Sequence, residues 1–117
     1  MGNLKYDSTM VEFDDRLLTH LQIVIVQKFR RGEPFLMSWL QDDGPRGEGG
    51  RTSLWMTPST PVYFKFYGSR VPSIDEEWLH RLAASADSST GLVITGEDGR
   101  PVRTHPVPGA RQRAAVA

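Results

Sequence analysis

The chain has 117 residues, with 14 Lys and Arg against 14 Asp and Glu, 38% hydrophobic residues and no cysteine. This length fits one ordinary domain and excludes a large multi-domain enzyme. The zero net charge excludes wholesale electrostatic capture of nucleic acid or of an anionic membrane, so any such binding must come from local clustering of charge. Without cysteine the chain has no disulfide and no thiolate metal site.

The first part of the chain predicts a β-hairpin followed by a helix. Residues 3–6 and 10–13 are expected to be the two strands, since Val11 and Phe13 alternate with Glu12. Residues 16–31 contain a β-branched run that favours a strand by propensity, but at about 100° per residue its apolar and basic side chains separate onto opposite faces. We therefore predict a helix, capped by Asp14 and ended by Gly32. Its apolar face is Leu17, Leu18, Leu21, Val24, Ile25 and Phe29.

The rest of the chain predicts four more strands and a second helix. Strands are expected at 34–40, 51–56, 62–67 and 91–95, with a mobile loop at 41–50 and a stiff, two-proline link at 57–61. Ser73 and Glu76 form a capping box that should open the second helix. The predicted fold is α+β in the order β-β-α-β-β-β-α-β, a mostly antiparallel sheet of five to six strands with two helices on one face. Residues 1–96 form this domain, and 97–117 are expected to be a disordered, weakly basic tail.

Catalytic signatures are scarce in this sequence. His20, His80 and His105 have no metal-ligand spacing, and the acids at 75–77 are explained by the start of a helix. Nucleophile-elbow, dinucleotide and P-loop motifs do not occur. We therefore expect no catalytic residue, no metal and no cofactor. The longest apolar run, at 23–26, is far too short to span a membrane, so we expect a cytoplasmic protein with no membrane partner.

An aromatic and basic cluster is the densest feature of the sequence. Strand alternation places Val62 and Phe64 on one face and Tyr63 and Lys65 on the other, with Trp55 expected on an adjacent strand. Aromatic rings beside cations on an open sheet face suit base stacking on single-stranded nucleic acid. The same composition suits a homodimer interface, which we favour, and the two uses are compatible. The candidate binding residues are Trp55, Tyr63, Lys65, Tyr67, Arg51 and Arg70.

A second candidate is the basic face of the first helix. Its residues are Arg16, His20, Arg30 and Arg31. Such a face could bind phosphate groups, but an ordinary solvated helix surface explains it better.

Several blocks of the sequence resemble a known family. The segments MGNLKYDS, VEFDDRLLTHLQ, RRGEPFLMSW, TSLWMTPSTPVYFKFYGSR and VPSIDEEWLHRLAASADSSTGL occur in order over residues 1–92. Together they resemble a family of small actinobacterial proteins of unknown function, often labelled ATP-dependent DNA ligase or ligase-like. That label implies a nucleotide-dependent enzyme or accessory, in which Lys5 and Asp7 of a KxDG-like motif would matter; Ser8 stands at the glycine position. The leading interpretation is a non-catalytic binding or self-association module, with the nucleotide-dependent activity as the alternative.

Overall fold

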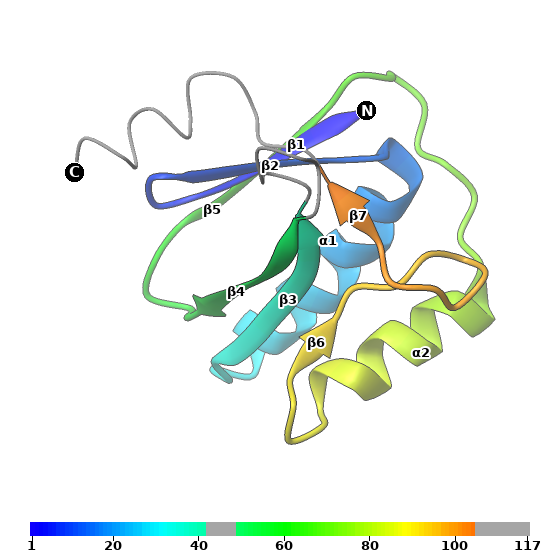
Figure 1. Cartoon of the computed structure of the whole chain (residues 1–117). Coiled ribbons are helices and arrows are strands. Elements are labelled where there is room, and N and C mark those ends of the chain that lie inside the picture. The colour runs from blue at the N-terminus through cyan, green and yellow to red at the C-terminus, as the bar shows by residue number, and fades with distance from the viewer. Residues whose placement is uncertain (42–48, 105–117) are drawn as a thin grey trace.

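The computed structural model of the chain describes residues 1–41 and 49–104. Its strands and helices confirm the predicted α+β class and the mostly antiparallel pairing (Figure 1). In chain order the elements are β1 (Gly2–Tyr6), β2 (Thr9–Phe13), α1 (Asp15–Arg30), β3 (Phe35–Gln41), β4 (Gly50–Met56), β5 (Val62–Phe66), α2 (Glu76–Ala86), β6 (Leu92–Val93) and β7 (Arg103–Thr104).

The strands divide between two sheets, where the sequence predicted one. Sheet A has the order β2-β1-β5 and is antiparallel throughout. Sheet B has the order β4-β3-β6, with β7 also pairing with β3; β4 is antiparallel to β3, whereas β6 and β7 are parallel to it. The division occurs at residues 57–61, where Pro58 and Pro61 prevent a tight hairpin. The chain therefore leaves β4 and adds β5 to β1 of the other sheet.

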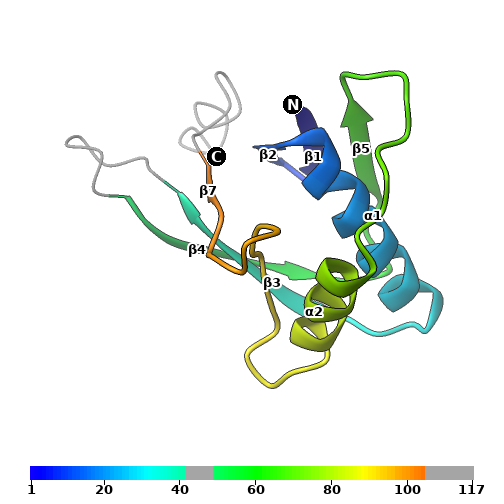
Figure 2. The same ribbon diagram turned by 90° about the vertical axis from the view of Figure 1, so that its right-hand side faces the viewer.

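The two sheets and the helices enclose one core. Figure 2 shows α1 and α2 together on one side of β3 and β4. The ring of Phe13 in sheet A meets that of Trp39 in sheet B edge to face, with centroids 6.0 Å apart. Buried Tyr6 also joins the sheets, because its hydroxyl accepts a hydrogen bond from the backbone N–H of Thr57 at 2.8 Å. Further buried side chains are Leu4, Val11, Leu17, Leu18, Leu21, Val24, Ile25, Phe35, Met37, Met56, Trp78, Leu82, Leu92 and Ile94.

The first helix has the predicted caps, and the second does not. The Asp14 carboxylate accepts from the N–H of Arg16 at 3.1 Å, and Gly32 follows α1 with φ of +70°. At α2 the cap is Asp75, whose carboxylate accepts from the N–H of Trp78 at 3.1 Å. The predicted capping box at Ser73 was wrong, because the helix begins only after Asp75.

Residues 97–104 belong to the packed body, although the sequence placed them in a tail. The N–H of Leu40 in β3 donates to the carbonyl of Val102 at 3.1 Å, and Thr104 in β7 is buried. Backbone pairing with β3 holds this segment, and such pairing leaves little pattern in the side chains. The rest of the predicted tail, 105–117, and residues 42–48 of the predicted loop lie outside the described residues.

Candidate functional site

The outer face of sheet A carries the exposed tyrosines. In β5, Val62, Phe64 and Phe66 are half-buried towards the core, whereas Tyr63 and Lys65 are exposed on the opposite face. Tyr63 and Tyr67 are each 59% exposed, which is high for aromatic side chains in a small domain. The face that the sequence assigned to binding is thus the one turned away from the core.

Strand β1 supplies a second lysine and an amide to this face. Lys5 lies directly opposite Tyr63, and Asn3 lies directly opposite Lys65. Directly opposite residues of an antiparallel pair have Cβ atoms about 5 Å apart, so each cation lies within reach of an aromatic ring or a neighbouring polar group. The Asn3 amide donates to the hydroxyl of Tyr67 at 3.3 Å. We call Tyr63, Tyr67, Lys5, Lys65 and Asn3 the tyrosine face.

The first turn of α1 fixes the position of Tyr67. The Asp15 carboxylate accepts from the N–H groups of Gly68 at 2.8 Å and Tyr67 at 3.3 Å. These hydrogen bonds, that from Gly68 foremost, favour the ionised carboxylate and lower the pKa of Asp15 below its ordinary value. The chain just beyond β5 is therefore attached to the helix rather than left as a loose end.

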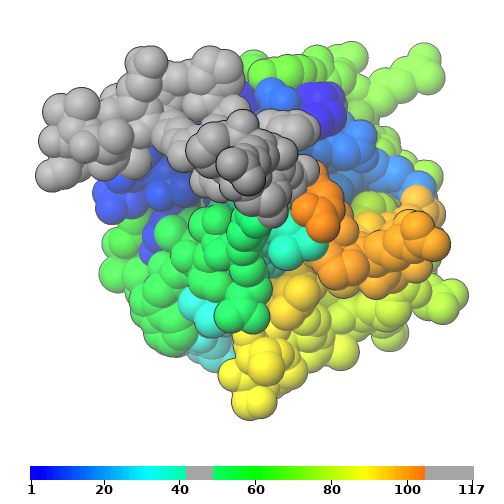
Figure 3. All heavy atoms as spheres, in the orientation of Figure 1, coloured from blue at the N-terminus to red at the C-terminus, as the bar shows by residue number. Residues whose placement is uncertain are grey.

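Trp55 lies on the other sheet, so the predicted neighbourhood of Trp55 and Tyr63 was wrong. It is opposite Leu36 of β3 and 58% exposed, on the same outer face of sheet B as Val93. Arg51 is exposed on this face as well. Figure 3 shows the green atoms of β4 at the front of the molecule, beside the yellow atoms of β6. The six candidate residues therefore do not form one surface.

Arg70 belongs to neither sheet face. It follows β5 and lines a hollow of about 160 Å³ together with Thr19 and Gln22 of α1. Arg70 therefore lies beside α1 and not on the outer face of sheet A. The pattern of alternation that places Tyr63 and Lys65 does not extend to it, because the strand ends at Phe66.

Not all residues of the predicted basic face of α1 are exposed. His20 is completely buried, which corrects its assignment to that face. Helix α2 covers this side of α1, and the imidazole packs against the Trp78 ring with centroids 4.3 Å apart. Arg16 forms an ion pair with Glu97, whereas Arg30 and Arg31 are exposed at the far end of the helix. The four residues therefore do not form a phosphate site.

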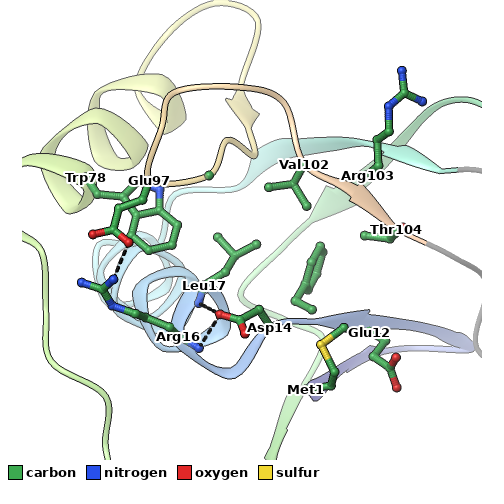
Figure 4. A pocket seen from close by; sticks show the side chains of 12 residues that line it. Met1, Glu12, Asp14, Arg16, Leu17, Trp78, Glu97, Val102, Arg103 and Thr104 are labelled. Carbon is green, nitrogen blue, oxygen red and sulfur yellow. Dashed lines mark hydrogen bonds and ion pairs between the residues drawn. The ribbon is translucent and has the colours of Figure 1, made fainter.

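A cleft of about 370 Å³ opens between β2, the start of α1 and residues 96–104. Figure 4 shows Arg16 and Glu97 directed towards one another at one end, with Trp78 behind them and Glu12 at the other end. The Nε of Arg16 also donates to the carbonyl of Ser73 at 3.3 Å. Pockets of this size accept small organic ligands. No sequence pattern indicated this cleft, because its walls come from distant segments and one of these segments was assigned to the tail.

The KxDG-like residues lie at the tip of the first hairpin. Lys5 is exposed on the tyrosine face, and Asp7 lies in the β1–β2 turn with φ of 55°. Within residues 1–41 and 49–104, no group of three or more His, Asp or Glu is placed to hold a metal ion. In the same ranges, no helix has the length and apolar character that crossing a membrane requires.

Comparison of the chain with known proteins identifies one matching family. Neither the curated proteins nor the solved structures contain a match to the chain. The model of one protein family matches residues 1–97, which is most of the chain and includes both sheets' main strands and both helices. The chain therefore belongs to the family described as a domain of unknown function, DUF7882.

Proposed function

We propose that the protein is a non-catalytic binding module whose tyrosine face binds single-stranded nucleic acid. The observation that carries this proposal is the pairing of two exposed tyrosines with two lysines on one open sheet face. Along β5, the half-buried side chains that face the core alternate with the exposed ones. The exposed tyrosines therefore do not fill the interior.

The chemistry of the face fits a single strand better than a duplex. Bases stack on exposed aromatic rings whatever their identity, and each stacked base contributes about 1–3 kcal/mol. Tyr63 and Tyr67 are four residues apart, which corresponds to about 13 Å along an extended chain, so they would stack on different bases. Lys5 and Lys65 lie between and beside the rings, where the phosphates of such a strand would pass.

Charge limits the affinity that this face can reach. The chain has no net charge, and Glu12 of β2 lies opposite Asn3 at the border of the tyrosine face. Two phosphate contacts on a single strand correspond to a slope of log K against log salt of about −1.4. We therefore expect weak binding with a shallow dependence on salt.

A titration of fluorescently labelled oligothymidine at two salt concentrations tests the proposal. Tyr63→Ala should weaken binding by about 5- to 150-fold, because one stacking platform is lost. Tyr63→Phe keeps the ring and should bind like the wild type. Lys65→Ala should weaken binding and also make the salt dependence shallower.

Trp55→Ala is the matched control, because it removes an equally exposed aromatic side chain from the other sheet. It should leave unchanged the affinity for an oligonucleotide too short to contact more than one tyrosine face. Absence of binding up to about 100 µM at low salt would overturn the proposal. A dissociation constant of about 100 µM corresponds to about 5.5 kcal/mol, and two stacked bases at about 2–6 kcal/mol together with two phosphate contacts should reach it. Equal losses in Trp55→Ala and Tyr63→Ala would overturn the assignment to sheet A.

The ligase-like alternative and the cytoplasmic location stay predictions. Incubation with labelled ATP tests the former: a covalent AMP adduct that disappears in Lys5→Ala would establish nucleotide chemistry and would replace the binding module as the primary function.

A further inference from the structure

The outer edge of β4 is a second candidate binding surface, because its backbone groups can pair with another strand. Strand β4 is paired with β3 along all seven residues from Gly50 to Met56. On its other side no strand of the described residues pairs with it, and Figure 1 shows it as the outermost strand of sheet B. Long, regular edge strands are templates for pairing with another chain, and proteins usually protect them.

The hydrogen bonds of β3 show which groups of β4 point outwards. The carbonyl of Ser38 accepts from Ile94 at 2.9 Å and the N–H of Leu40 donates to Val102 at 3.1 Å, so these residues direct their backbone groups away from β4. The alternate residues of β3 then bond to β4, where their partners are Gly50, Thr52, Leu54 and Met56. The backbone groups of Arg51, Ser53 and Trp55 therefore point to the open edge.

We propose that β4 pairs with β4 of a second copy of this chain, antiparallel about a two-fold axis at Ser53. This register places Arg51 opposite the partner's Trp55, twice, and Ser53 opposite the partner's Ser53. The three outward-pointing residues form three hydrogen-bonded pairs, or about six backbone hydrogen bonds. The occupant is a second copy because the edge is complementary to itself.

Side chains select this register over its neighbours. Arg51 and Trp55 project from the same outer face, so each guanidinium lies beside an indole ring of the other copy, in a cation–π arrangement. An axis at Thr52 would leave Trp55 beyond the paired region, and an axis at Leu54 would do the same to Arg51. On the inner face, half-buried Thr52 of each copy lies opposite half-buried Leu54 of the other copy, so these side chains extend the core across the interface.

Sedimentation equilibrium of the full chain, from about 5 to 500 µM, tests the proposal with charge substitutions at one exposed position. Trp55→Arg places like charges opposite each other twice and should raise the dimer dissociation constant at least about tenfold. Trp55→Glu places a carboxylate opposite Arg51 of the partner and should keep the dimer. The double variant Arg51→Glu with Trp55→Arg should restore it.

Val93→Arg is the control, because it adds the same charge to the same outer face on the far side of β3. It should dimerise like the wild type, and far-ultraviolet circular dichroism should show all variants folded. A wild type that is monomeric at the highest concentration would overturn the proposal, even if another partner were found to pair with β4. A dimer that responds alike to Trp55→Arg and Trp55→Glu would overturn the register.

Discussion

His20 connects the two helices through both nitrogens of its ring. Its Nε2 accepts a hydrogen bond from the N–H of Asp75 at 3.0 Å, and Nδ1 lies 2.7 Å from the carbonyl oxygen of Arg16. Because Nε2 accepts, Nδ1 carries the proton and donates to that carbonyl. The residue that looked like a surface cation is thus a buried connector between α1 and the cap of α2.

Replacing this connector should destabilise the fold. In His20→Phe the ring volume is kept, but the N–H of Asp75 loses its acceptor inside the protein. We expect a loss of about 1–3 kcal/mol in the free energy of unfolding, measured by urea denaturation. His80→Phe changes an exposed histidine on α2 and should stay within about 0.5 kcal/mol of the wild type. Equal stability of the two variants would contradict the role given to His20.

Lys28 is the second buried polar connector between the helices. Its Nζ lies 2.5 Å from a carboxylate oxygen of Asp87, just after α2, and 3.3 Å from one of Glu33. The hydrogen bond from Lys28 lowers the pKa of Asp87, and the bond to Asp87 raises the pKa of Lys28. Each ion therefore widens the pH range over which its partner stays charged.

The pKa of Asp87 gives a sign for the pH dependence of stability. A carboxyl with a lowered pKa in the folded state stabilises the protein above its unfolded pKa of about 4, and this contribution is lost as pH falls through the folded value. Asp87→Asn should therefore be less stable than the wild type at pH 7, and the difference should vanish in strong acid. Denaturation at several pH values measures it, with Asp7→Asn in the exposed turn as the control. A difference that persists unchanged at pH 2 would contradict the ion-pair explanation.

At the scale of elements, local sequence patterns predicted the bounds, caps and apolar face of α1. They did not predict which other side chains of α1 are buried by neighbouring elements. The apolar face and both caps of α1 follow from spacing and end residues, and both are confirmed. His20 and Lys28 were not predictable as buried residues, because the helix that covers them begins only at Glu76, far along the sequence. Likewise β5 was identified as a strand, but its partner depends on the proline-containing link and not on β5 itself.

The entry to β6 depends on a glycine. Gly91 has φ of +79°, and a Cβ there would lie 2.5 Å from the carbonyl oxygen of Leu36. Gly99 has a similar φ of +82° with nothing within 4 Å of such a Cβ. Gly99→Ala should therefore cost only the backbone strain, about 1 kcal/mol, and Gly91→Ala about 2 kcal/mol more through displacement of β3. Urea denaturation compares them, and equal losses would show that the contact with Leu36 is relieved at no cost.

Short strands explain the misplaced end of the domain. β7 has only two residues, so it offers no alternation long enough to identify. β6 is equally short, but it lies within the strand expected at 91–95. They are stabilised by backbone pairing with β3 and by Thr104 and Ile94 entering the core. The cleft beside α1 exists because of this segment, and for that reason the sequence did not reveal it.

At the scale of the whole molecule, the division into two sheets separates two surfaces that the sequence had merged. The tyrosine face belongs to sheet A, and the open edge with Arg51 and Trp55 belongs to sheet B. Nucleic-acid binding and self-association thus need not compete for the same side chains. A dimer through β4 would carry two tyrosine faces.

Two faces on one dimer predict a dependence on oligonucleotide length. Above the dimer dissociation constant, an oligothymidine long enough to contact both faces should bind the wild type at least about tenfold more tightly than a short one, because the second contact is intramolecular. Trp55→Arg, which is expected to be monomeric, should bind the short oligonucleotide like the wild type and lose the gain for the long one. Fluorescence anisotropy with both lengths measures this. A gain for the long strand that survives in Trp55→Arg would mean that the two faces are not linked through β4, while loss of short-strand binding in that variant would place Trp55 in the nucleic-acid site itself.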